Sequence, residues 1–323
     1  MWKNEYIQLM FTEKENRKDV QRALELKYQN IPPALYKYRS CNKFALENLQ
    51  QDEMWFNSSD KMNDPYDSAL TINQEDYIHT PIKIELLKNL PNVFEKLNIE
   101  KDPLELKEME KKGIDEVYRY VLNFVPELEG DKEKINSIAD EMKSFLNEAF
   151  EEKAQSMVDT IQKSTFISCF SEKNDSMLMW SHYTENHEGF CIEYNFTKPN
   201  VDPTLINTLH PVIYSKKLFD ISKYLIEGFE DHSSYNALST IYAAISKSID
   251  WGYEKEWRIV YTLGQREKGF NRKFFTPEAI YLGAKISKED KATLMKIAGE
   301  KQISVYQMKL KKDEFKLEAE KIL

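Results

Sequence analysis

Two glutamates two residues apart, Glu254 and Glu256, are the side chains in this sequence best suited to chemistry. At the start of an expected strand, side chains at positions i and i+2 point to the same face of the sheet. Two carboxylates on one face repel each other, so the pKa of one rises or a cation or ligand lies between them. The alternative is a solvated acidic edge paired with Lys255 or Arg258. The spacing therefore predicts either an acidic site or surface ion pairs.

Two other segments place a polar side chain among apolar ones. Arg39 ends the alternating run LYKYR, and at the end of a short strand a guanidinium can bind a phosphate or a carboxylate. Ser168 lies in the apolar run FISCF, where its hydroxyl needs a hydrogen-bond partner. The alternatives are a surface salt bridge for Arg39 and a bond to a backbone carbonyl for Ser168. No GxSxG surrounds Ser168, so a hydrolase nucleophile is not predicted.

The segment MWSHYTENHEG adds Trp180, His182 and Tyr183. An aromatic ring here could stack on a ligand, and His182 could contact one. The alternative for His182 is a structural role, with its ring bonded to backbone. His182 and His187 are five residues apart, so they do not share a helix face, and no HExxH is present. We therefore predict no zinc site.

An acidic turn provides a different hypothesis. Asp64 and Asp67 in NDPYD could join Glu254 and Glu256 as oxygen ligands for Mg²⁺, as in a metal-dependent nuclease or phosphoesterase. The alternative is a turn in which the Asn and Asp side chains bond their own backbone.

Composition limits the class of protein. The chain has 323 residues, of which 41% are hydrophobic and 12% aromatic, enough for one large domain or two smaller ones. The net charge of −9 argues against a non-specific nucleic-acid binder, which needs clustered Lys and Arg. Three cysteines without pairing motifs indicate a reducing compartment. No stretch approaches the ~20 apolar residues that span a bilayer, so we expect a cytoplasmic protein without a membrane partner.

The elements that must position these residues indicate an α+β fold. We expect a single domain over residues 1–323, with small mixed or antiparallel sheets from about 34–60 and 164–310. Residues 1–30 form a helical N-terminal extension and residues 74–163 a helical insertion lobe, because apolar residues recur there at helical spacing. Further strands are expected at 34–40, 54–59, 164–172, 189–196, 257–263, 279–283 and 303–310, an extended segment at 209–214, and helices at 42–51, 176–185, 218–249 and 285–301.

Four segments together resemble a bacterial family known as domain of unknown function 2971. They are LYKYRS, WFNSSDKMNDPYD, ISCFSEKNDSMLMWSHYTENHEGFCIEY and YEKEWRIVY followed by IYLG. The resemblance covers roughly residues 34–284, and the order of the motifs is its most specific feature. It implies no established activity. Proteins of this type are sometimes associated with anti-phage or stress functions.

A more distant resemblance, to ADP-ribosyltransferases of the arginine-serine-glutamate type, implies a mechanism. In that family an Arg or His ends an early strand, Ser-Thr-Ser lies in a hydrophobic strand, and an ExE precedes a later strand. Arg39, Ser168 and Glu254-x-Glu256 match these places, although Cys169 and Phe170 replace the Thr-Ser.

The resemblance implies that NAD is the substrate. Glu256 would stabilise the positive charge that develops on the ribose as nicotinamide leaves. Arg39 would hold the pyrophosphate, Ser168 would brace the glutamate or the ribose, and Glu254 would orient an unidentified acceptor. The remaining residues expected at the nucleotide are the aromatic side chains and the histidine, Tyr38, Trp180, His182 and Tyr183.

Two other functions stay open at the level of sequence. One is a regulatory module that binds a nucleotide-like small molecule without catalysis and uses residues 74–163 to engage a partner. The other is the metal-dependent nuclease or phosphoesterase.

Overall fold

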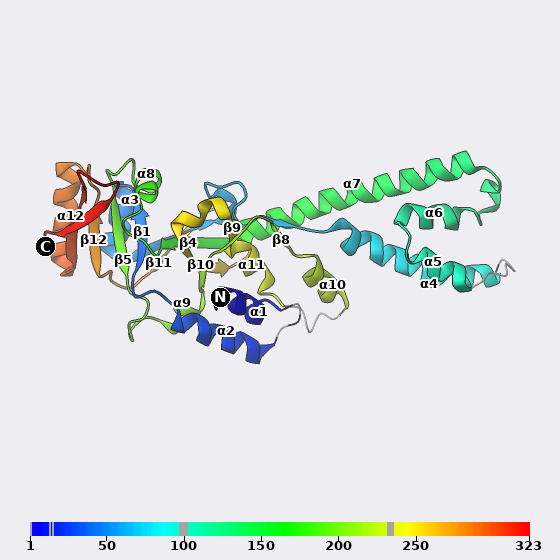
Figure 1. Ribbon diagram of the computed structural model, residues 1–323, viewed down its shortest axis with the longest axis horizontal. Helices are drawn as coiled ribbons and strands as arrows, with labels where there is room; N and C mark the ends of the chain where they lie inside the picture. Colours follow the sequence, from blue (N-terminus) through cyan, green and yellow to red (C-terminus); the bar gives the residue numbers. More distant parts are fainter. Residues whose placement is uncertain (1, 13, 15, 97–102, 231–235) are drawn as a thin grey trace. The chain divides into compact units, whose positions relative to one another are not determined.

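A computed structural model describes residues 2–12, 14, 16–96, 103–230 and 236–323 (Figure 1). It confirms the α+β class. The chain divides into two compact units. The first comprises residues 1–69, 160–219 and 237–323, and the second comprises residues 70–159 and 220–236. All residues of the candidate site lie in the first unit.

The first unit is built on one large sheet. Its strand order is β11-β2-β4-β1-β5-β12-β13-β14, with β10 and β6 joined to the other edge of β4. Most pairs are antiparallel, whereas β12 and β13 run parallel. The strands are β1 Leu35–Arg39, β2 Glu53–Ser58, β4 Thr165–Ser171, β5 Phe190–Tyr194, β6 Leu209–Pro211, β10 Glu256–Thr262, β11 Phe270–Lys273, β12 Ala279–Leu282, β13 Ser304–Leu310 and β14 Leu317–Lys321.

One edge of β4 is shared by two strands that separate along it. Strand β1 meets β4 only at Tyr36, opposite Ser171. Strand β2 meets it at the other end, where Ser58 lies opposite Phe166. The opposite edge of β4 is paired with β10 along its whole length. The sheet therefore opens between β1 and β2, and the candidate site lies at this opening.

The two faces of the sheet are covered by different helices. The largest apolar cluster joins strand residues such as Phe166, Phe170 and Ile280 to α3 (Lys43–Gln51) and α12 (Lys288–Lys301). Helix α8 (Met177–Tyr183) contributes Trp180 to a cluster with Tyr38, whose side chain lies on the other face of β1. Both faces carry apolar side chains, and the burial of these side chains is the main driving force for folding.

The expected N-terminal helices are present as α1 (Trp2–Met10) and α2 (Arg17–Gln29). The hydroxyl of Tyr6 is hydrogen-bonded to Nδ1 of His210 on β6 at 2.6 Å. The buried Lys27 ammonium donates to the carbonyls of Ile206 and Asn207, each at 2.9 Å. These bonds join α1 and α2 to the segment around β6.

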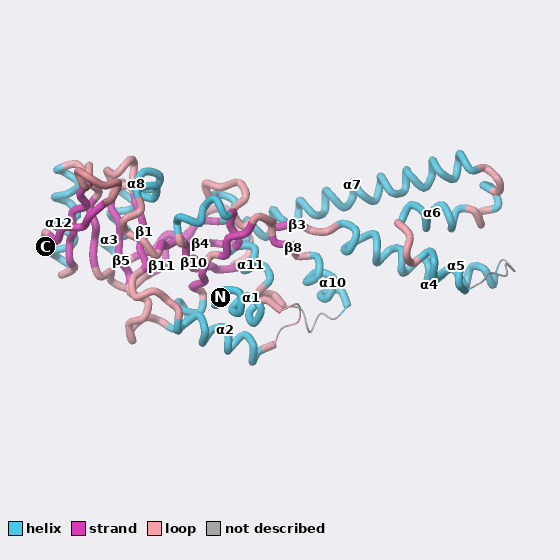
Figure 2. Tube along the Cα trace, in the orientation of Figure 1, coloured by secondary structure: helices cyan, strands magenta, loops and turns pink. Residues whose placement is uncertain are grey.

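The second unit is mainly helical (Figure 2). Its buried core includes Leu87, Phe94 and Val117. Arg119 donates to Asp115 and to Asp140, which joins α6 to α7. The helices are a π-helical turn at Glu75–His79, α4 Thr80–Lys96, α5 Pro103–Met109, α6 Ile114–Leu122, α7 Lys132–Ser164 and α10 Ser222–Glu230. The last residues of α7, from residue 160 on, belong to the first unit. No helix in the described ranges is both long and apolar enough to cross a membrane.

Some expectations about elements were wrong. The sheets were expected to be small, but one has ten strands because the segments around β1 and β2 join the later strands in it. Residues 218–249 were expected to be helical, but this stretch also contains β8 (Phe219–Asp220) and β9 (Ser246–Ser248), and residues 231–235 lie outside the described part. Strands β11 and β14 were not expected, because their exposed polar residues hide the alternation.

Candidate functional site

Arg258 organises the carboxylates of the site. Its Nη1 and Nη2 donate to the two oxygens of Asp67 at 2.6 and 2.8 Å. Its Nε and Nη2 donate to the two oxygens of Glu256 at 2.9 and 3.1 Å, and Nη1 also donates to the carbonyl of Ala244 at 2.7 Å. All five N–H groups of this fully buried guanidinium are therefore used. Burial opposes its charge, but Asp67 and Glu256 raise its pKa well above the usual range.

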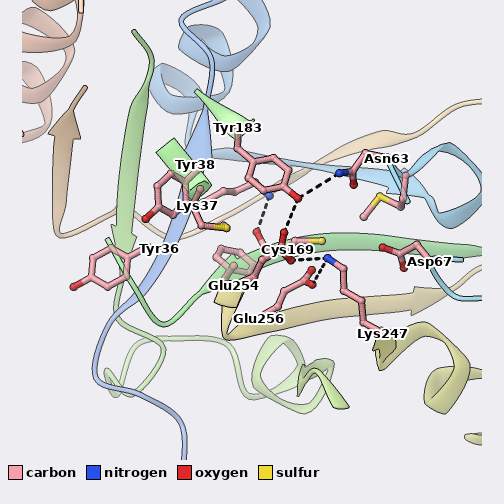
Figure 3. A pocket seen from close by; sticks show the side chains of 13 residues that line it. Tyr36, Lys37, Tyr38, Asn63, Asp67, Cys169, Tyr183, Lys247, Glu254 and Glu256 are labelled. Carbon is pink, nitrogen blue, oxygen red and sulfur yellow. Dashed lines mark hydrogen bonds and ion pairs between the residues drawn. The ribbon is translucent and has the colours of Figure 1, made fainter. Parts of the chain in front are cut away.

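Lys247 on β9 lies between the two glutamates. Its Nζ donates to Oε2 of Glu254 at 2.5 Å and to Oε2 of Glu256 at 3.0 Å. It also lies 4.8 Å from the centre of the Trp251 ring. The hydroxyl of Tyr183 donates to the other oxygen of Glu254 at 2.6 Å (Figure 3). A cation between the two carboxylates was one expectation, and Lys247 is that cation. The alternative, a solvated edge paired with Lys255 or Arg258, is right only in that Arg258 pairs with Glu256, because both glutamates are buried and Lys255 is exposed.

The two glutamates converge for a reason other than strand alternation. Glu254 ends a 3₁₀ helix (Ile249–Glu254) and Glu256 begins β10. Between them, Lys255 has φ 47°, in the left-handed region. This residue reverses the chain, so the convergence comes from a turn. Left-handed backbone is disfavoured for residues other than glycine, which indicates that the surrounding contacts hold it.

The two carboxyl groups have different pKa values. Burial would raise the pKa of Glu256, but Arg258 and Lys247 lower it to about 2. Burial and then the charge of Glu256 raise the pKa of Glu254, and Lys247 and Tyr183 only partly offset this. Glu256 is therefore a fixed negative charge, whereas Glu254 is the more easily protonated of the two carboxylates. Pairs of acids with separated pKa values are typical of acid–base sites.

Lys37 occupies the opening between β1 and β2. Its Nζ donates to Oγ of Ser168 at 2.8 Å and to the carbonyl of Cys169 at 3.1 Å. It makes no ion pair with any residue in the described ranges. Burial and then the charge of Arg39 lower its pKa to about 8. The expected partner of Ser168 was a glutamate, a ribose or a backbone carbonyl, and the structure gives it this ammonium or amine instead.

A cavity of about 240 Å³ adjoins these groups, and we call it the carboxylate cavity. Figure 3 shows Tyr183, Lys247, Glu254 and Glu256 directed toward one another. It combines fixed charges with an aromatic wall. Its lining residues are Tyr36, Lys37, Tyr38, Met62, Asn63, Asp67, Cys169, Phe170, Met179, Tyr183, Lys247, Glu254 and Glu256.

A second cavity, of about 670 Å³, shares Tyr38 and Tyr183 with the first, and we call it the arginine cavity. Arg39 is among the residues that line it, and its guanidinium forms no hydrogen bond or ion pair within the described chain. The side chain of Trp55 is 37% exposed there. Free donors beside an exposed ring suit an anionic ligand with a flat ring. The lining residues are Tyr38, Arg39, Ser40, Asn42, Phe44, Asn48, Trp55, Tyr183 and Asn271.

The structure brings together most of the residues expected from sequence. Arg39, Tyr38, Tyr183, Glu254 and Glu256 all line one or both cavities, and Ser168 lies next to them through Lys37. Two residues that were expected to contact a ligand, Trp180 and His182, line neither cavity. The ring of Trp180 is fully buried and its Nε1 donates to the carbonyl of Asn174, and His182 is exposed on α8.

Sequence reasoning missed Lys247 and the anchoring role of Arg258. Lys247 lies in a segment expected to be helical, and nothing in its spacing links it to the glutamates. Arg258 is two residues after Glu256 on β10, so both side chains point to the same face of the strand, which was a usable signal. Lys37 lies two residues from Arg39 on the same face of β1, which was also a usable signal.

The carboxylates of the metal hypothesis are already engaged. Both oxygens of Asp67 accept from Arg258, and Oδ1 of Asp64 accepts from the backbone N–H of Tyr66, as in the expected turn. Across the ranges that the structure describes, no group of three or more His, Cys, Asp or Glu residues is arranged to hold a metal ion.

The fold and site define an α+β protein with a buried cluster of ionised side chains at an opening in a mixed sheet. Residues 179–259 match the family described as "Protein of unknown function (DUF2971)". The match supports the first resemblance over a shorter range than residues 34–284, and it includes most of α8 and all of β5, with Lys247, both glutamates and Arg258. No curated protein and no solved structure matches the chain, and no comparison supports the resemblance to ADP-ribosyltransferases.

Proposed function

We propose that the protein is an NAD-using enzyme that transfers ADP-ribose. The observation that carries this proposal is the arrangement of the three sequence motifs on neighbouring strands. Arg39 ends β1, Ser168 lies on β4 and Glu256 begins β10, and β4 pairs with both of the other strands. Arg39 and the glutamates line two cavities that share Tyr38 and Tyr183. A dinucleotide has a charged middle and two ring systems, which fits two adjoining cavities.

In the proposed reaction, the bond between C1′ of the ribose and the nicotinamide nitrogen breaks, and its electron pair leaves with nicotinamide. The fixed charge of Glu256 stabilises the cationic ribose electrostatically. An acceptor N–H or O–H attacks C1′, and its proton goes to Glu254, whose raised pKa suits a general base. Tyr183, bonded to Glu254, lies on the wall that the nicotinamide would contact.

Arg39 is assigned the pyrophosphate because it is a half-buried cation without a protein partner in the described chain. Charge-assisted bonds from a planar guanidinium to phosphate are strong and geometrically specific. Arg39→Ala should therefore weaken NAD binding by at least tenfold. Arg272→Ala, at an exposed arginine that donates to Tyr261, should not change it.

The test is incubation of the purified protein with NAD labelled in the ADP-ribose part, with and without cell lysate. Nicotinamide release and transfer of label are both measured. Glu254→Gln should reduce release by about 10²–10⁴-fold, the usual contribution of general acid–base catalysis. Glu188→Gln, at an exposed glutamate after α8, is the matched control. No release under any condition, from a folded protein that binds NAD, would overturn the proposal.

A second candidate function is a nucleotide sensor without catalysis. The observation that favours it is that both carboxylate oxygens of Glu254 and of Glu256 already accept hydrogen bonds from protein side chains. A sensor would bind NAD or a related nucleotide without releasing nicotinamide. Equilibrium binding together with the release assay distinguishes the two functions.

In a cell, an enzyme of the proposed kind would act as an anti-phage or toxin-type effector. Expression of the wild-type chain should then slow growth, whereas Glu254→Gln at equal abundance should not. Normal growth of cells that contain soluble, active wild-type protein would contradict the effector role and leave the enzymatic proposal intact.

A further inference from the structure

The carboxylate cavity contains two lysines whose surroundings are opposite. Nζ of Lys247 contacts two carboxylates, and although burial opposes its charge, Glu256 and Glu254 raise its pKa. Nζ of Lys37 donates to two neutral oxygens, Oγ of Ser168 and the carbonyl of Cys169, and lies 5.2 Å from the centre of the Phe170 ring. The first lysine is thus held as an ammonium ion, whereas the second lacks a counterion within bonding distance among the described residues.

The contacts of Lys37 match a neutral amine. An ammonium ion has three N–H donors, but a neutral amine has two, and the structure supplies two acceptors. In the neutral form both N–H groups are satisfied and the lone pair is left for a ligand. The charged and ionisable groups that act on it are Arg39, Cys169 and Glu256, with burial as the main cause of its lowered pKa. Desolvation of this kind is how lysines become nucleophiles.

We propose that Lys37 is a nucleophilic amine that forms an imine with a small aldehyde or ketone bound in the carboxylate cavity. This activity goes beyond NAD cleavage and does not depend on it. The cavity of about 240 Å³ suits a ligand with a single ring, and its wall includes Tyr36, Tyr38 and Tyr183. Figure 3 shows Tyr183 beside Lys37 and directed toward Glu254, whereas the ring of Tyr36 points away from them.

The chemistry balances without a further reactant. The Lys37 amine adds to the carbonyl carbon, and one of its protons moves to the carboxylate of Glu254. Glu254 returns that proton to the alkoxide oxygen of the adduct, which becomes a hydroxyl. Glu254 then carries the second N–H proton to this hydroxyl, which leaves as water as the C=N bond forms. The sum is amine plus carbonyl compound giving imine plus water. A carboxyl group with a raised pKa can serve in both directions.

The test uses benzaldehyde as the probe, with cyanoborohydride to trap the imine and mass spectrometry of peptides to find the modified lysines. At pH 7.5, Lys37 should be labelled at least tenfold faster than Lys247 in the same cavity and than the exposed lysines. Lys37→Arg should remove this fast labelling, and Glu254→Gln should slow it without affecting exposed lysines.

The wild-type protein alone decides the outcome if a variant does not fold. Labelling of Lys37 no faster than that of exposed lysines would overturn the proposal, and so would equal labelling of Lys247. Fast labelling of Lys37 in a protein that never releases nicotinamide from NAD would support this inference while removing the proposed transferase activity. The two proposals can therefore fail separately.

Discussion

The guanidinium of Arg258 forms a two-pronged bond with Asp67, a residue 191 positions away, with N–O distances of 2.6 and 2.8 Å. Both side chains are buried. The pair joins β10 to the turn after β2 and fixes the same arginine that holds Glu256. The pair therefore helps to fix the geometry of the carboxylate cavity.

Loss of this arginine should strongly destabilise the protein. Arg258→Met leaves Asp67 and Glu256 as buried charges without their main partner, a change that typically costs 3–5 kcal/mol. Arg272→Met, at an exposed arginine, should cost less than about 1 kcal/mol. Urea unfolding of both variants measures this difference. Equal midpoints for the two variants would show that the buried ion pairs do not hold the first unit together.

Removal of the Tyr183 hydroxyl should shift the pH dependence of NAD cleavage. The hydroxyl donates to Glu254 and lowers its pKa, so Tyr183→Phe raises that pKa further. A general base must be ionised, and the acid limb of the rate profile should therefore move to higher pH. The shift should be on the order of one pH unit, as expected for one hydrogen bond to a charged group. Tyr253→Phe is the control, and an unmoved acid limb in Tyr183→Phe would remove Glu254 from the base role.

The close packing at Gly189 should make this glycine intolerant of substitution. A Cβ atom here would lie 2.2 Å from the carbonyl oxygen of Arg39 and 2.9 Å from Cβ of Thr184. Gly189→Ala should therefore displace the end of β1 and cost roughly 1–3 kcal/mol. Gly299→Ala in α12, where no atom lies within 4 Å of the added Cβ, should be neutral or stabilising by up to about 1 kcal/mol. Thermal unfolding compares them, and a neutral Gly189→Ala would contradict the packing.

Lys27 should make the stability depend on pH. Burial lowers its pKa from 10.5 to about 7 in the folded protein, so between these values the unfolded chain binds more protons. Stability then rises as the pH increases from 7 toward 10.5, by at most about 1.4 kcal/mol per pH unit for this group. Lys37, with a pKa lowered to about 8, contributes in the upper part of the same window.

Urea unfolding between pH 7 and pH 9.5 tests this dependence. Lys27→Met should flatten the rise, whereas Lys18→Met, at an exposed lysine in the same helix, should leave it unchanged. An equally steep rise in Lys27→Met would assign the dependence to other groups.

The sequence predicted those parts of the fold in which local pattern and tertiary structure agree. Strand β1 alternates, β4 and β10 are rich in β-branched and aromatic residues, and the expected ranges differ from the observed ones by one residue at each end. The spacing of Glu254 and Glu256 identified the acidic pair correctly, although a left-handed residue between them and not the strand makes them converge.

The rest of the site could not be predicted because its contacts are distant in sequence. Nothing local links Asp67 to Arg258, and the Ser168 partner Lys37 is 131 residues away. Trp180 was expected to face a ligand because aromatic side chains suit that role, but the same ring also suits a core position. Only the packing of α8 against Tyr38 distinguishes the two.

The bond between Tyr6 and His210 has a consequence for anyone who shortens the chain. His210 lies directly opposite Arg258 in the pairing of β6 with β10, so α1 supports the sheet behind the arginine. Deletion of the first ten residues, or their removal by a protease, would leave the buried imidazole of His210 without its hydrogen bond to the Tyr6 hydroxyl. The damage should then appear as lost ligand affinity, although the removed segment lines neither cavity.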